Sequence, residues 1–237
     1  MKRATAIVLM GLALAAHPVS ARAGNSQTIV EGLATAALTS IVCSSVALTA
    51  GEDAKQDEFA RRGWLIGVAG SYAIETFKDD TESDAQKIFG PTASLSVDDS
   101  FGFNGRVGYR CHRWFSAEVE VEWLDRFKTD LSAAGPINIG IDIEPVVVTA
   151  NMKGYILTGR YQPFLLVGGG VMTAEFKSRG VPGSITLNEF TMRFGGGIDL
   201  YATKNVVVTV GADYVLPFDD LKDLDYISIG WGFEYRF

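Results

Sequence analysis

The chain is short of the residues that mark several common classes of protein. Of its 237 residues, only two are cysteine and seven are proline. So few cysteines exclude a disulfide-rich secreted scaffold. The low proline content argues against collagen-like and proline-rich disordered chains. Acidic residues outnumber basic ones, 28 to 21, and a surface with this excess repels nucleic acid. We therefore expect no nucleic-acid partner.

Long uncharged apolar stretches are also scarce, and the N-terminus comes nearest to one. Lys2 and Arg3 precede the apolar residues 6–16, and residues 21–23 (Ala-Arg-Ala) fit an A-x-A cleavage site. The apolar run is too short for a permanent membrane helix. We predict that residues 1–23 are a cleaved export signal. Residues 24–62 follow as an extension to which the pattern assigns no structure.

The two cysteines could pair in an oxidising compartment. Cys43 lies in a segment rich in alanine, serine and threonine, whereas Cys111 lies in an alternating segment close to charged residues. Such different contexts give no sign of a disulfide framework. We expect two unpaired thiols.

From residue 63 onward the hydrophobic pattern has a period of two. In the clearest segment, Glu118, Glu120 and Glu122 alternate with apolar residues. Glutamates at every second position cannot form one stripe of a helix, because the helical period of 3.6 would scatter them. The same alternation predicts eight strands, at residues 63–77, 101–111, 115–127, 146–158, 163–176, 190–201, 206–216 and 226–237.

The connections between these strands alternate in length. Long connections (78–99, 129–144, 177–187 and 217–225) alternate with short ones near 112–113, 159–162 and 203–205. Short turns at one rim and long loops at the other are typical of outer-membrane barrels. The sequence therefore predicts an all-β fold, a closed antiparallel eight-stranded up-and-down transmembrane β-barrel over residues 63–237, located in the cell outer membrane.

A soluble barrel with its apolar face inside would alternate in the same way. Two features favour the membrane. The polar face is rich in glycine, alanine and serine, which a narrow lumen requires. The apolar face carries aromatic residues towards the strand ends, as interfacial girdles do; they are Trp64, Trp123, Tyr214, Trp231 and Tyr235. A soluble periplasmic ligand-binding barrel is the less favoured alternative.

Two parts of the sequence resemble known families. The last strand alternates up to a C-terminal Phe237 and resembles the assembly signal of bacterial outer-membrane proteins. Residues 103–110 and 114–120 resemble the second and third strands of the OmpA-like β-barrel superfamily, and the resemblance spans about residues 63–237. It implies that the barrel assembly machinery recognises the aromatic residues of the last strand, Trp231, Phe233, Tyr235 and Phe237. No periplasmic domain is expected after Phe237.

If the polar face lines the lumen, many charged side chains point into it. They are Glu75, Arg106, Arg110, Glu118, Glu120, Glu122, Lys153, Arg193, Asp199, Asp213, Glu234 and Arg236. Buried charges are tolerated only when they are paired and hydrogen-bonded. We predict a network of salt bridges that fills the lumen. The alternative is a gated conduit, opened when the pairs rearrange.

The sequence offers little for catalysis or metal binding. His112, the one histidine beyond the export signal, lies at a short turn, where a solvated or interfacial role is the default. The acidic loops match no EF-hand spacing. We expect no enzymatic activity, no metal and no cofactor.

The function expected from these patterns is that of an integral outer-membrane protein with a structural or surface-interaction role. Its partners would be outer-membrane lipid and lipopolysaccharide. A small passive channel for small solutes is the alternative. The sequence identifies no surface ligand.

Overall fold

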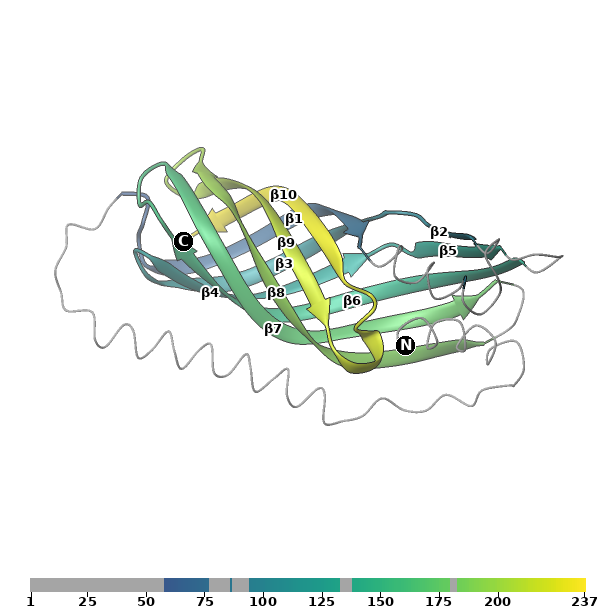
Figure 1. The fold of residues 1–237 in the computed structure, drawn as a ribbon. Helices are drawn as coiled ribbons and strands as arrows, with labels where there is room; N and C mark the ends of the chain where they lie inside the picture. The colour runs from purple at the N-terminus through teal and green to yellow at the C-terminus, as the bar shows by residue number, and fades with distance from the viewer. Residues whose placement is uncertain (1–57, 77–85, 87–93, 133–137, 180–182) are drawn as a thin grey trace.

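A computed structural model describes residues 58–76, 86, 94–132, 138–179 and 183–237. The predicted export signal and residues 24–57 lie outside this range. The structure is an antiparallel β-barrel closed by eight strands (Figure 1), which confirms the predicted fold. In chain order the barrel strands are β1 (Gly63–Glu75), β3 (Ser100–His112), β4 (Phe115–Leu124), β6 (Asn138–Tyr155), β7 (Tyr161–Ser178), β8 (Ser184–Tyr201), β9 (Val206–Pro217) and β10 (Tyr226–Arg236).

The first and last strands close the ring. β1 pairs with β10 on one side and with β3 on the other, so Gly70 lies opposite both Trp231 and Phe103. β4 pairs with β6, and β6 pairs with β7. A closed ring leaves no edge strand along its wall. Within the described residues no helix is long and apolar enough to cross a bilayer.

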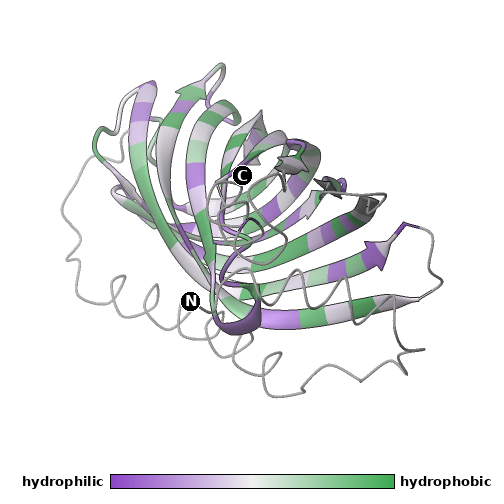
Figure 2. Ribbon diagram, turned by 45° about the vertical axis from the view of Figure 1, so that its right-hand side comes forward, coloured by the Kyte–Doolittle hydropathy of each residue, from purple (hydrophilic) through white to green (hydrophobic). Residues whose placement is uncertain are grey.

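Residues that alternate in the sequence point to opposite faces of the barrel wall. Trp64 and Val68 point outward and are 61% and 64% exposed, whereas Leu65 between them is 1% exposed. Figure 2 shows the resulting bands of polar and apolar residues along the strands. β7 carries apolar residues on both faces, and in it Phe164 is buried and Leu165 is exposed.

Two strands were missed by the sequence analysis. β2 (Ser94–Val97) and β5 (Phe127–Ser132) lie largely in the predicted long connections. β5 pairs with the first part of β6, and β2 pairs with β5. Such short segments give little periodicity, and their pairing depends on the long neighbouring strand that supplies main-chain partners.

Together with the far ends of β6, β7 and β8, these strands project beyond the ring (Figure 1). We call this projecting sheet the long-loop extension and its side of the barrel the long-loop rim. The opposite side, with the tight connections, is the short-turn rim.

An apolar cluster fills the interior next to the long-loop rim. It includes Leu124 of β4, Met172 of β7 and Val215 of β9, all at most 1% exposed. Leu221 and Leu224 join it from the connection between β9 and β10, which contains the short 3-10 helix η1 (Asp219–Leu221). We call this cluster the long-loop core. This connection therefore folds over the end of the barrel rather than away from it.

At the short-turn rim, the residues that precede β1 contact the interior. The Phe59 ring packs edge-on against Tyr201, with 5.3 Å between centroids. The carbonyl oxygen of Phe59 accepts a hydrogen bond from Nε2 of Gln162 at 3.1 Å, and Ala60 is buried. Residues 59 and 60 thus cover part of this end of the lumen.

Cys111 departs from the sequence prediction. It is buried, because the pairing of β3 with β4 shifts register between Arg110 and His112. It is also disulfide-bonded, so the prediction of two unpaired thiols was wrong. Cys43 lies outside the described residues. Sequence context was a poor guide because pairing depends on which thiols the fold brings together.

Candidate functional site

The site is the barrel interior, and strand alternation positions its side chains. Glu118, Glu120 and Glu122 are the inward residues of β4, and all three are at most 2% exposed. Register brings partners to them. Arg106 of β3 lies directly opposite Glu120. Ion pairs between strands that are not neighbours in the wall can form only across the lumen, which is where most of the pairs described below lie.

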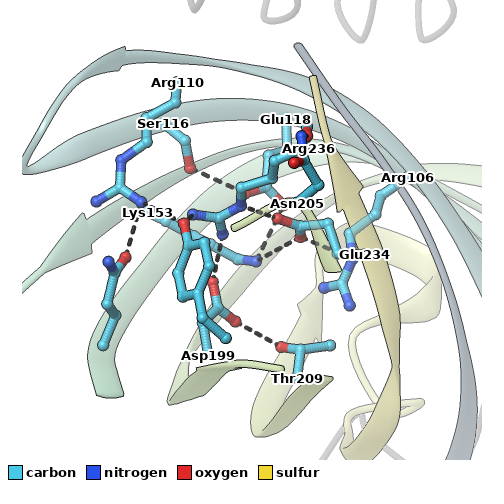
Figure 3. A network of polar contacts seen from close by, with 12 residues as sticks. Arg106, Arg110, Ser116, Glu118, Lys153, Asp199, Asn205, Thr209, Glu234 and Arg236 are labelled. Carbon is cyan, nitrogen blue, oxygen red and sulfur yellow. Dashed lines mark hydrogen bonds and ion pairs between the residues drawn. The ribbon is translucent and has the colours of Figure 1, made fainter. Parts of the chain in front are cut away.

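The first group of charges lies nearer the short-turn rim, because Lys153, Asp199 and Arg236 stand close to the short-turn ends of their strands. Figure 3 shows its contacts. We call it the Arg236 cluster, and it consists of Arg106, Glu118, Lys153, Asp199, Glu234 and Arg236. Arg236 contacts Glu234 at 2.5 Å and Asp199 at 2.6 Å. Lys153 Nζ lies 3.2 Å from Glu118 and 3.9 Å from Glu234. The cluster contains equal numbers of cations and carboxylates, so it can be buried without a net charge.

Neutral polar groups complete this cluster. The hydroxyls of Tyr155 and Tyr201 accept hydrogen bonds from Arg236. Ser116 donates to Glu118, and Thr209 donates to Asp199. The sequence analysis did not count these residues as part of the site. The period-two pattern could have found them, because each lies two or four positions from a charged residue of the inner face.

Arg110 is held mainly by neutral groups. It donates to Oε1 of Gln162 at 2.7 Å, to the Tyr201 hydroxyl and to the carbonyl oxygen of Arg113. Its guanidinium carbon also lies 4.1 Å from the centroid of the Tyr155 ring. A flat guanidinium suits such stacking. Arg110 therefore joins the covering residues of the short-turn rim to the Arg236 cluster.

The second group lies further towards the long-loop rim. We call it the Arg193 cluster, and it consists of Glu120, Glu122, Arg193 and Asp213. Arg193 of β8 contacts Glu120 at 2.7 Å, Glu122 at 2.5 Å and Asp213 at 3.6 Å. The Tyr226 and Ser228 hydroxyls also donate to Glu122. One arginine thus bridges two carboxylates of β4 across the lumen and a third on the neighbouring strand β9.

Close approach of the backbone makes room for this cluster. Gly195 of β8 lies directly opposite Asp213 in β9. A Cβ atom at Gly195 would come within 1.9 Å of Oδ1 of Asp213. A side chain at this position would therefore displace the carboxylate, which explains why a glycine stands here in the strand.

Glu75 is the one predicted network residue outside both clusters and Arg110. It is the last residue of β1 and is only partly buried. The other predicted residues are buried or nearly so and occur at inward positions. Among the described residues, no three potential metal ligands of the His, Cys, Asp or Glu type come together.

Two further features lie at the short-turn rim. Glu58, before β1, forms an ion pair of 2.5 Å with Lys204, and this hydrogen-bonded ammonium holds the pKa of the Glu58 carboxyl below its usual value. His112 lies at the end of β3, where its Nδ1 accepts a long hydrogen bond from the backbone N–H of Trp114.

The aromatic residues of the last strand all point outward. Trp231, Phe233 and Tyr235 in β10, and Phe237 just after it, are 45% to 66% exposed. β10 is an interior member of the ring and pairs with both β1 and β9. These side chains therefore form a continuous apolar row on the outer wall.

Three solved structures are among those similar to this chain. The surface protein A of Neisseria has a solved structure that is 16% identical, with 74% of this chain and 97% of that chain covered and a TM-score of 0.50. OprG of Pseudomonas aeruginosa is 13% identical, over 76% of this chain and 98% of that chain, with a TM-score of 0.48. Ail, the attachment invasion locus protein of Yersinia pestis, is 20% identical over 74% and 97%, with a TM-score of 0.43.

No curated protein matches the sequence. The model of the outer membrane protein β-barrel domain matches residues 34–237, which is most of the chain and includes every barrel strand. Together with the closed eight-stranded ring and its apolar outer wall, this match excludes the soluble periplasmic alternative. The chain belongs to the outer membrane protein β-barrel domain family and is a protein of the outer membrane.

Proposed function

We propose that this protein is a sealed outer-membrane barrel that carries an interaction surface on its long-loop extension, and that it neither conducts solutes nor catalyses a reaction. The long-loop core is the observation that carries this proposal. Its apolar side chains pack across the interior, and Leu124, Met172 and Leu221 are at most 1% exposed. An apolar core of this kind has no path for ions or polar solutes.

Two more layers support the same conclusion. The Arg193 and Arg236 clusters fill the middle of the interior with paired charges, and Phe59 and Ala60 cover part of the short-turn rim. An eight-stranded barrel has a lumen that side chains can fill completely. A passive channel would need the long-loop core and both clusters to separate at the same time.

The long-loop extension supplies the surface for interaction. Its outer face carries ion pairs between neighbouring strands, among them Lys177 with Glu144 at 2.7 Å and Arg179 with Asp142 at 3.1 Å. We place this rim outside the cell, because outer-membrane barrels have short periplasmic turns and longer extracellular loops. There the extension would meet the polar part of lipopolysaccharide and any external partner.

The outward aromatic row of β10 supports a role in assembly. We propose that Trp231, Phe233, Tyr235 and Phe237 are read by the barrel assembly machinery before insertion and contact lipid afterwards. Their exposure on the apolar outer wall is consistent with both steps.

Single-channel recording in planar lipid bilayers tests the sealed barrel. The refolded protein is expected to give no conductance steps, while a known porin recorded in the same bilayers gives them. Discrete steps from the wild-type protein that change in size in Glu120→Gln would establish the channel instead. Steps that persist unchanged in Glu120→Gln would also contradict a sealed barrel, but would place the conducting path elsewhere.

A further inference from the structure

The short-turn rim carries exposed cations from several connections. Each of the three tight connections has one cation and no carboxylate: Arg113 between β3 and β4, Arg160 between β6 and β7, and Lys204 between β8 and β9. Arg61 and Arg62 precede β1 at the same rim, and all five residues are exposed. Clustered positive charge at one end of the barrel favours an anionic partner there.

The chain itself supplies an acidic segment directly before β1. Residues 52–58 contain four carboxylates and one lysine. The last of the four, Glu58, forms the ion pair of 2.5 Å with Lys204. The next residue, Phe59, packs against Tyr201 inside the rim. The acidic segment therefore ends at a point that is fixed on the short-turn rim.

The disulfide of Cys111 supplies a second fixed point. Cys111 lies near the end of β3, two residues before Arg113, and is disulfide-bonded. The chain has two cysteines, and the other is Cys43. Cys111 is 4% exposed, so a second copy of the chain would have to reach a buried sulfur. These observations favour Cys43 of the same chain as the partner.

We propose that residues 43–58, which we call the strap, cross the short-turn rim and cover it. A disulfide between Cys43 and Cys111 ties one end of the strap, and the pair of Glu58 with Lys204 ties the other. The remaining carboxylates of the strap pair with exposed arginines of the rim. The match to the family model begins at residue 34 and includes the whole strap, so the strap is part of the barrel domain.

Two arginines of the rim have donors to spare for the strap. The guanidinium carbon of Arg113 lies 5.4 Å from the centroid of the Trp114 ring. Arg160 donates from Nε and Nη2 to the carbonyl oxygens of Tyr201 and Ala202. A guanidinium has five N–H donors, so both arginines can also bind carboxylates.

The length of the strap suits this path. Eight strands spaced about 4.8 Å apart, and tilted as barrel strands are, give a ring roughly 15 Å across. The stretch from residue 43 to residue 58 can extend over about 50 Å at most. The strap can therefore cross the rim with both of its ends held there.

Formation of the disulfide requires an oxidant. The two thiols lose two protons and two electrons as the S–S bond forms. Thiol–disulfide exchange passes the electrons to an oxidoreductase whose own disulfide becomes a dithiol. The bacterial periplasm contains oxidants of this class. This step rests on the orientation given under the proposed function, which places the short-turn rim in the periplasm.

Peptide mapping of protein purified from outer membranes tests the tie. Free thiols are blocked, the protein is digested without reductant, and mass spectrometry identifies the linked peptides. A single link between the peptides of Cys43 and Cys111 is expected. A link between the Cys111 residues of two copies, a free thiol at Cys111, or a mature chain without residue 43 would overturn the proposal.

Limited digestion of the folded protein in detergent tests whether the strap is docked. A protease that cuts before aspartate must seat several residues in an extended form, so a docked strap resists cleavage before Asp53 and Asp57. Replacing Cys43 and Cys111 by serine should speed this cleavage about fivefold or more, because cleavage follows the population of the open form. An unchanged rate in this double variant would overturn the docking.

Charge reversal tests which rim holds the strap. Arg113→Glu combined with Lys204→Glu should also speed cleavage of the strap about fivefold or more. The matched control is Lys128→Glu combined with Lys222→Glu, which makes the same charge change at exposed positions of the long-loop rim. The control should be cut at the wild-type rate.

Equal rates in the two charge-reversed proteins would overturn the pairing of the strap with the short-turn rim. The mobility of unboiled protein in SDS shows that each variant has folded. Digestion in detergent depends neither on conductance nor on which rim faces the cell exterior. A failure of the strap is therefore distinct from a failure of the sealed barrel.

Discussion

Arg193 shows how a charged residue is tolerated inside this barrel. Its guanidinium is 1% exposed and contacts Glu120, Glu122 and Asp213. Each carboxylate that loses water is compensated by the same cation and by hydroxyl donors such as Tyr226. Alternation alone predicts that these residues share the inner face. Which of them pair could not be predicted, because pairing across the lumen depends on barrel diameter and strand stagger.

Replacing Arg193 by methionine should destabilise the barrel strongly. The change leaves three buried carboxylates without their shared cation, and breaking a buried ion pair costs about 3–5 kcal/mol. Urea unfolding in lipid vesicles, followed by tryptophan fluorescence, measures the loss. Adding Glu122→Gln to Arg193→Met should recover part of it.

Arg126→Met is the control for this prediction. The Arg126 side chain is 47% exposed and lies 3.4 Å from the buried Asp142, which keeps a second cation, Arg179, at 3.1 Å; a pair whose cation is this exposed contributes about 0–1 kcal/mol. If both variants unfolded at the same urea concentration, the Arg193 cluster would not be important for stability.

At the scale of the strand, consecutive residues of β4 face two different environments, the membrane and the lumen. Val121 is 45% exposed on the outer wall, and its neighbours Glu120 and Glu122 are buried in the lumen. A shift of one residue in register would exchange the two faces. Strand position and facing were predictable for this reason, whereas β2 and β5 were too short to produce a clear pattern.

Val121→Arg should destabilise the protein in vesicles by about 2–4 kcal/mol, because an arginine on the lipid-facing wall near the bilayer midplane must be hydrated or drawn to the interface. Ala117→Arg lies on the same face of β4, closer to the short-turn rim and its aromatic residues, and should cost about 0–1 kcal/mol. Equilibrium unfolding in vesicles compares the two. A harmless Val121→Arg, together with improved insertion of Glu120→Leu, would mean that the faces are reversed.

The last strand can be tested in cells. Replacing Tyr235 and Phe237 by serine should leave more protein in the periplasm and less in the outer membrane. Refolding into detergent in vitro should be affected less, because the substituted side chains lie on the outer wall and detergent refolding does not use the assembly machinery. Cell fractionation measures the first effect, and normal membrane levels of the double variant would contradict the assignment.

At the scale of the whole molecule, stability comes from closure. Each barrel strand pairs with two neighbours, and β1 with β10 completes the ring. A closed barrel satisfies its backbone hydrogen bonds internally and offers no edge from which to unravel. The interior then adds the two charge clusters and the long-loop core.

This closure predicts that the protein is heat-modifiable. Unboiled protein in SDS should keep β-rich circular dichroism and migrate differently from boiled protein, because mild detergent cannot open a ring without edges. Identical mobility before and after boiling, in protein that is soluble without detergent, would contradict a membrane barrel.

The sequence by itself determined the strands, their faces and the closed barrel, because a period of two records on every second residue whether the chain meets lipid or the lumen. It placed Glu118 and Arg193 inside without naming their partners. The tertiary structure decided three further features: the pairing of Arg193 with β4, the disulfide of Cys111, and the long-loop core. Each joins residues far apart in the chain, and contacts at that range depend on strand stagger and loop folding, which a local pattern does not encode.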